Sequence, residues 1–161
     1  MRRSQLRVRT LVTLRWLVIA GEVLLLLVVG LGLGFKAPYP LCFAVIGIAA
    51  LVNLATGILS PGQRVFGDRE ATAQLAVDIL QISALMYLTG GTANPFVLLL
   101  IAPVTLAAAT LPAWPVAVLG GLASAASVAL AFVFMPLPVA PGSATAMSES
   151  YRIGAAIANM A

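Results

Sequence analysis

The sequence predicts an all-α fold: a polytopic transmembrane helix bundle with five full spans and the start of a sixth. Of the 161 residues, 61% are hydrophobic and 9% are charged, and the mean hydropathy is +1.08. A soluble domain has roughly 45 to 50% apolar and about 25% charged residues, so a water-facing surface could not cover this composition. Apolar runs long enough to cross a bilayer as helices recur between short breaks. Intrinsic disorder and a disulfide scaffold are excluded by the high apolar content and the single cysteine.

The breaks between the runs place the spans within one membrane domain that covers residues 1–161. The breaks consist of proline and glycine, such as Pro61 with Gly62 and Gly90 with Gly91. The fourth run contains Pro103, which we expect to kink it near mid-membrane. The sixth run is too short to cross the bilayer. The predicted spans are about residues 14–35, 41–59, 71–88, 95–111, 116–134 and 151–161, the last incomplete.

The arginines predict the orientation of the bundle. Basic residues near span ends stay on the cytoplasmic side, so the N-terminus should be cytoplasmic and the turn at Gly90–Pro95 should lie outside. Lys36 and Arg152 would then lie outside too. The first run is longer than the roughly 7 to 15 residues of a signal-peptide core, which favours an uncleaved span. The arginines expected inside are Arg2, Arg3, Arg7, Arg9, Arg15, Arg64 and Arg69.

Two carboxylates lie within predicted spans, and each is a candidate functional group. Glu22 and Asp78 each cost roughly 2.5 to 3.5 kcal/mol to insert at a helix centre. Gln74, Asp78 and Gln81 follow an i, i+4, i+7 spacing that places them on one helix face, and Asn53 reaches a similar depth. These groups could simply bond helices together, at about 0.6 kcal/mol per contact, or could serve a ligand or a proton.

Small residues recur at four-residue spacing in two predicted spans. They are Gly30 with Gly34 in the first span, and Gly121, Ala125 and Ala129 in the fifth. Such ridges allow close helix approach, either within the fold or between two copies of the chain.

The segment between the third and fourth runs reads Gly-Gly-Thr-Ala-Asn-Pro-Phe. Locally it predicts a helix end at the glycines, a cap at Asn94 and a helix start at Pro95, and this structural interpretation is sufficient without a ligand. The same groups could bind a flat carbonyl compound. The glycines allow close approach, the Asn94 amide can donate to a quinone oxygen, and Phe96 can stack. The candidate quinone-binding residues are Gly90, Gly91, Thr92, Asn94, Pro95 and Phe96.

These features together resemble a known family, the membrane sensor region of RegB/PrrB-type redox-responsive histidine kinases. The resemblance covers roughly Leu14 to Pro112. In that family a GGxxNPF heptapeptide between the third and fourth of six spans is implicated in sensing ubiquinone. The chain departs from the family at Thr92 and Ala93, where an Ala-Asn pair is frequent, and at Glu22, where Gln is expected. The matching motifs are Arg15-Trp16 followed by Gly21, Asp78-x-x-Gln81, Leu88-Thr89-Gly90-Gly91 and Asn94-Pro95-Phe96.

The resemblance implies a ubiquinone-sensing membrane domain of a two-component sensor histidine kinase in the bacterial inner membrane. The implied partners are the lipid bilayer, the quinone, a second copy of the chain, a cytoplasmic kinase domain and a response regulator. No metal or nucleic acid is implied. Asp78, Gln81 and Glu22 are candidates for a relay. The chain has no histidine, so it cannot be phosphorylated on histidine, and a kinase domain is expected after residue 161.

Two other function classes stay open at this point. A small transporter could use Glu22, Asn53 and Asp78 as a midplane site, since buried carboxylates also mark transport paths. A structural assembly subunit is the third interpretation. A longer reading frame that encodes a histidine-containing dimerisation helix and an ATP-binding domain would favour the sensor.

Overall fold

A computed structural model describes residues 8–28, 37–59 and 65–135, without the side chains of Val8, Ala93, Pro95 and Phe96. Every regular element in this part of the chain is a helix. The predicted span 151–161 and the residues Lys36, Arg64 and Arg152 lie outside the described residues. The helices are α1 (Val8–Leu27), α2 (Tyr39–Leu59), α3 (Asp68–Leu88), the 3-10 segments η2 (Gly91–Ala93) and η3 (Pro95–Leu100), α4 (Ile101–Thr110) and α5 (Ala113–Phe132).

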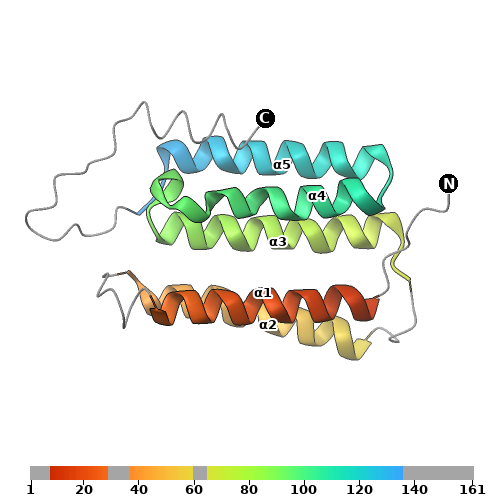
Figure 1. Cartoon of the computed structure of the whole chain (residues 1–161), viewed down its shortest axis with the longest axis horizontal. Coiled ribbons are helices and arrows are strands. Elements are labelled where there is room, and N and C mark those ends of the chain that lie inside the picture. The colour runs from red at the N-terminus through yellow and green to blue at the C-terminus, as the bar shows by residue number, and fades with distance from the viewer. Residues whose placement is uncertain (1–7, 29–36, 60–64, 136–161) are drawn as a thin grey trace, which may run out of the picture.

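The five α-helices form an up-and-down bundle (Figure 1). Helices α1, α3 and α5 run in one direction, and α2 and α4 run back. Four of them, α1, α2, α3 and α5, are long and apolar enough to cross a membrane, and Val97–Thr110 forms a shorter apolar helix. The chain is therefore a multi-span membrane protein. The turn between α3 and η3 lies at the end of the bundle opposite the start of α1 (Figure 1).

The fourth element differs from the single, centrally kinked helix that the sequence predicts. It consists of six residues of 3-10 helix, η3, followed by the ten residues of α4. Pro103 lies in the first turn of α4, where a missing backbone donor costs little. Because a 3-10 helix rises about 2.0 Å per residue instead of 1.5 Å, the two segments together reach about 27 Å, close to a bilayer core.

Two helices begin earlier than their apolar runs suggest. Helix α1 starts at Val8, which places Arg15 well inside the helix. Helix α3 starts at Asp68, after Gly67 as N-cap. The Gly67 amide donates to the Glu70 carboxylate at 3.1 Å, and two acidic residues in the first turn suit the positive end of the helix. A capped polar turn therefore extends α3 beyond its hydrophobic part.

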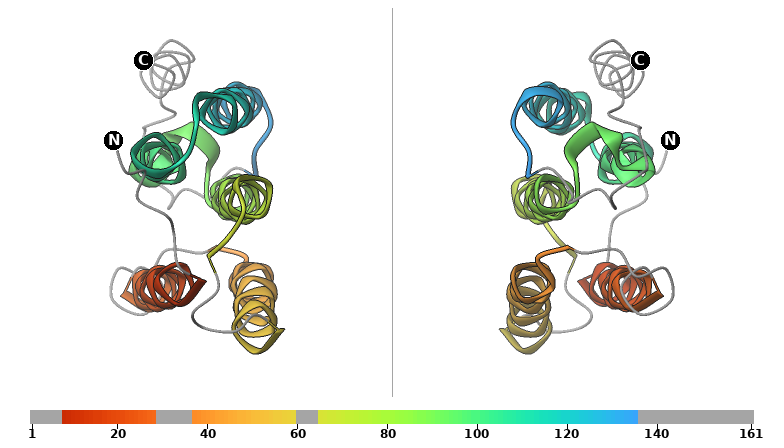
Figure 2. Two further views of the ribbon diagram at one scale, coloured as in Figure 1. Left: turned by 90° about the vertical axis from the view of Figure 1, so that its right-hand side faces the viewer. Right: turned by 90° about the vertical axis from the view of Figure 1, so that its left-hand side faces the viewer.

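Helix α3 is the centre of the bundle, since it packs against α2, α4, α5 and the turn (Figure 2). Its Leu75 and Ile79 are fully buried, together with Leu100 and Leu119. Helix α1 packs against α2, but none of its Cα atoms lies within 8 Å of one in α3. Side chains alone therefore connect α1 to α3.

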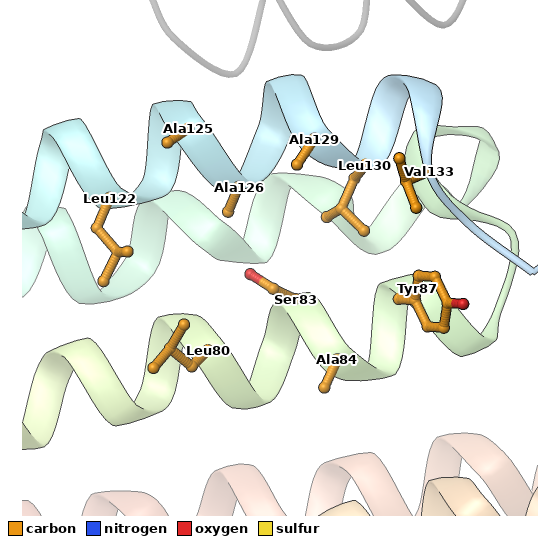
Figure 3. A pocket seen from close by; sticks show the side chains of 10 residues that line it. All are labelled: Leu80, Ser83, Ala84, Tyr87, Leu122, Ala125, Ala126, Ala129, Leu130 and Val133. Carbon is orange, nitrogen blue, oxygen red and sulfur yellow. The ribbon is translucent and has the colours of Figure 1, made fainter.

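The ridge of Gly121, Ala125 and Ala129 faces outward from α5 in the described part of the chain. Packing within these residues does not account for it, and Gly30 with Gly34 lies outside them. An apolar groove of about 380 Å³ lies between α3 and α5 and is lined in part by Ala125 and Ala129 of the ridge. Figure 3 shows the side chains that line it. Its lining residues are Leu80, Ser83, Ala84, Tyr87, Leu122, Ala125, Ala126, Ala129, Leu130 and Val133.

Candidate functional site

The turn after α3 has the backbone that its glycines predict. Gly90 has φ 100° and Gly91 has φ 62°, both in the left-handed region that favours glycine. Helix α3 ends at Leu88, η2 follows, and Asn94 adopts an extended conformation immediately before η3 starts at Pro95. The interpretation as helix end, turn and helix start is confirmed.

The end of α5 occupies the open side of Gly91. A Cβ atom at this position would lie 2.6 Å from the Leu130 carbonyl oxygen and 2.8 Å from the Phe134 Cβ. Gly90, Gly91 and Thr92 are all buried. The close approach that we expected for a ligand at Gly91 is thus made by α5, and a ligand would have to contact the turn from another side.

The Asn94 amide ties the turn back to the end of α3. Its Nδ2 donates to the Thr89 hydroxyl at 2.9 Å and, at 3.4 Å, to the Thr89 carbonyl. The Asn94 backbone amide donates to the Gly91 carbonyl at 3.1 Å. Asn94 therefore stabilises the turn itself. The Pro95 and Phe96 side chains, predicted to contact a quinone, lie outside the described set.

Thr92 has hydrogen-bonding capacity that the described residues do not use. The residue is 2% exposed, and its Oγ1 has no hydrogen-bond partner among the described residues. A buried hydroxyl without a partner costs roughly 1 to 3 kcal/mol, and most such groups in native proteins are satisfied by protein, water or a ligand.

A second polar site lies between α1, α2 and α3. Arg15 Nε contacts Asp78 Oδ1 at 2.7 Å, with side-chain exposures of 8% and 19%. A second nitrogen of the same guanidinium, Nη1, donates to the Gln74 side-chain oxygen. The Gln74 amide in turn donates to the Thr56 hydroxyl at 2.9 Å. A guanidinium on α1 thus joins a carboxylate and an amide on α3, and the amide continues the link to α2.

Two further contacts complete this polar cluster. Gln81 Nε2 of α3 donates to Glu22 Oε2 of α1 at 2.6 Å. The fully buried Asn53 of α2 donates to the Val12 carbonyl of α1 at 3.0 Å. We use the term polar cluster for its seven side chains, Arg15, Glu22, Asn53, Thr56, Gln74, Asp78 and Gln81.

The polar cluster confirms that Gln74, Asp78 and Gln81 share one face, because all three contact α1 or α2. The sequence prediction places Arg15 among the cytoplasmic arginines and therefore does not identify it as the partner of Asp78. Thr56 is not singled out by the sequence either. The seven-residue spacing from Arg15 to Glu22 places both on one face of α1, but it does not indicate that this face meets Asp78 of α3.

The polar cluster retains unused donors and acceptors. Arg15 Nη2 and Asn53 Oδ1 are buried and have no hydrogen-bond partner among the described residues. The same part of the chain contains no group of three or more His, Cys, Asp or Glu residues that could hold a metal ion. The side chains of the cluster can form hydrogen bonds, pair charges and bind protons.

The turn and the polar cluster are separate sites on one helix. Gln81 lies seven residues before Leu88, the last residue of α3, which corresponds to about 10 Å along the helix axis, and the turn follows Leu88. The last turns of α3 connect the two.

Comparisons with known proteins agree with a membrane sensor. The family model of the PilS-like transmembrane domain, a six-span type, matches residues 1–158. The sensor histidine kinase RegB of Cereibacter sphaeroides is 34% identical over 148 residues, which cover 92% of this chain and 32% of that protein. RegB from a named strain of the same species is 34% identical over 77 residues, 48% of this chain and 17% of its own length. The chain thus spans about a third of RegB or less. No solved structure gives a significant match. The chain belongs to the PilS-like transmembrane domain family and is a membrane sensor region of the RegB type.

Proposed function

We propose that the chain is the six-span sensor domain of a histidine kinase and that it reports the redox state of ubiquinone to a cytoplasmic kinase domain. In this proposal the chain acts as a homodimer in the bacterial inner membrane, with its N-terminus cytoplasmic and a response regulator as the next partner. The similarity to RegB supports the kinase context. The ligand part of the proposal rests on the buried Thr92 hydroxyl in the turn, which has no hydrogen-bond partner among the described residues.

The proposed quinone site consists of Gly90, Gly91, Thr92, Asn94, Pro95 and Phe96. A quinone carbonyl oxygen only accepts hydrogen bonds, whereas a quinol hydroxyl also donates. The Thr92 hydroxyl can donate to the carbonyl oxygen of a quinone and can also accept from the O–H of a quinol, so the direction of this hydrogen bond can differ between the two oxidation states. Because α5 occupies the open side of Gly91, the ring approaches the turn from the side away from Leu130.

Binding would act on the kinase by shifting the arrangement of the helices. A ligand shifts such an equilibrium only by its different affinity for the two states, and a difference of 1.4 kcal/mol changes the ratio about tenfold. Helix α3 leads directly into the turn and also contains Asp78 and Gln81. Asp78 contacts Arg15, and Gln81 contacts Glu22. Asp78, Gln81 and Glu22 form the relay in this proposal, and oxidised quinone lowers kinase output.

The proposal is tested by titrating the purified chain in lipid nanodiscs with ubiquinone while following tryptophan fluorescence. Replacing Thr92 with Val keeps the side-chain shape and removes the hydroxyl, which should weaken binding about fivefold for a hydrogen bond of about 1 kcal/mol. Asn94→Ala and Phe96→Ala should weaken it too. Unchanged affinity in all three variants would refute the site.

A matched change in the polar cluster separates the sensor from a transporter. Asp78→Asn removes the carboxylate that a midplane transport site would need, yet it leaves the turn unchanged. Ubiquinone binding should therefore survive in this variant. Loss of quinone binding in Asp78→Asn together with normal binding in Thr92→Val would contradict the proposal.

A further inference from the structure

The polar cluster contains two acidic side chains and one basic side chain. Its ionisable members are Arg15, Asp78 and Glu22. Arg15 and Asp78 form an ion pair at 2.7 Å, and their charges cancel. Glu22 forms no ion pair with the described residues, and its side chain accepts a hydrogen bond from the neutral Gln81 amide. An ionised Glu22 would leave the cluster with one net negative charge inside the membrane, where unpaired charge is costly.

The charged groups near Glu22 are of both signs. Arg15 lies two turns before it on α1, and Asp78 and Gln81 face it from α3. Helix α2, which packs against α1, has Tyr39 and Cys42 as its titratable residues and no charged one.

The hydrogen bond from Gln81 is compatible with proton uptake. Oε2 of Glu22 can accept from the Gln81 amide as a carboxylate oxygen or as the carbonyl oxygen of the acid. The acid also gains an O–H group, which can donate to the Gln81 carbonyl oxygen. Adding a proton therefore removes the charge and keeps the contact between α1 and α3.

A row of polar side chains leads to Glu22 along α3. Gln74, Asp78 and Gln81 are spaced by four and three residues, which is about 6 and 4.5 Å along the helix axis. The row begins about 9 Å from the start of α3 at Asp68, on the end of the bundle away from the turn.

We propose that Glu22 is a proton-binding site inside the membrane domain, with Gln81 as its hydrogen-bond partner in both charge states. The carboxylate takes up one proton from water that enters beside the row of polar side chains on α3 and becomes a carboxylic acid, and the proton returns to water by the same route. The ligand is the proton alone, so the proposal does not depend on quinone binding at the turn. Protonation switches the net charge of the cluster between −1 and zero and changes the field at Arg15.

Infrared difference spectroscopy of the chain in lipid nanodiscs, titrated between acid and alkaline pH, tests this proposal. Glutamate labelled with carbon-13 at its side-chain carboxyl marks Glu22, Glu70 and Glu149 and leaves the aspartates unlabelled. We expect a pH-dependent carbonyl band of a protonated, labelled glutamic acid that disappears in Glu22→Gln. Glu70→Gln is the matched control and should keep the band, because Glu70 lies at the start of α3.

A second variant covers the case in which Glu22→Gln alters the fold. Gln81→Leu keeps Glu22 and removes its hydrogen-bond partner, so the band should shift in frequency and its titration midpoint should move. A wild-type chain without such a band would overturn the proposal. A band that is unchanged in both Glu22→Gln and Gln81→Leu would overturn it as well.

Discussion

The ion pair between Arg15 and Asp78 should dominate the link between α1 and α3. No close backbone contact joins these two helices, so the link depends on side chains. Replacing Arg15 with Gln leaves the Asp78 carboxylate without its cation, and replacing Asp78 with Asn leaves the guanidinium without its anion. Removing one partner of a buried pair costs about 3 to 5 kcal/mol. Because Asp78 keeps 19% of its side chain exposed, we expect about 3 kcal/mol for each single variant.

The double variant separates charge pairing from simple loss of contacts. Arg15→Gln with Asp78→Asn removes both charges together and leaves two neutral amides that can bond to each other. We therefore expect the double variant to be more stable than either single variant, within about 2 kcal/mol of wild type. Unfolding with a denaturing detergent in mixed micelles, followed by far-ultraviolet circular dichroism, measures the order of stability.

A control variant on the same helix tests whether the loss of any polar side chain from α3 lowers the stability of the bundle. The Ser83 hydroxyl donates to the Ile79 carbonyl within its own helix, and Ser83→Ala should change stability by less than about 1 kcal/mol. If the losses of the two single variants add in the double variant, the ion pair does not couple α1 to α3 and the reasoning is wrong.

Three further changes test the packing of the turn and the cluster by the same unfolding assay. Gly91→Ala should cost at least about 2 kcal/mol, because its φ is 62° and the new Cβ would meet the Leu130 carbonyl at 2.6 Å. Gly121→Ala is its matched control: nothing lies within 4 Å of the added Cβ in a regular helix, so stability should stay equal or rise by up to about 1 kcal/mol. Asn53→Ala should cost about 1 kcal/mol, because it removes the hydrogen bond to Val12, and a more stable variant would contradict that role.

The ends of the helices could be predicted from sequence only where backbone chemistry sets them. The end of α3 at Leu88 is where the prediction placed it, because the following glycines adopt conformations that other residues avoid. The start of α3 lies three residues earlier than predicted, because hydropathy does not register a polar first turn. The cap between Gly67 and Glu70 forms that turn.

The sequence predicts which site residues share one face of a single helix, but it does not predict which residues of other helices they contact. The spacing of Gln74, Asp78 and Gln81 determines their common face, since it depends on the geometry of α3 alone. The pairing of Asp78 with Arg15 depends on how α1 is rotated and placed, which no local pattern records. For the same reason the glycine conformations could be predicted, whereas the occupation of Gly91 by the end of α5 could not.

The energies of these contacts indicate where a ligand at the turn could move the helices. A ligand that prefers one state by 1.4 kcal/mol changes its population about tenfold, but separating Arg15 from Asp78 would cost about 3 to 5 kcal/mol. Such a ligand therefore cannot detach α1 from α3. The end of α3 and its turn meet the end of α5 through the packing at Gly91 and through the hydrogen bond from the Met135 amide to the Tyr87 carbonyl at 2.8 Å, which is worth about 1 kcal/mol and involves no ion pair. We therefore expect a ligand-driven motion to occur between α3 and α5, with α1 and α2 following α3 through the polar cluster.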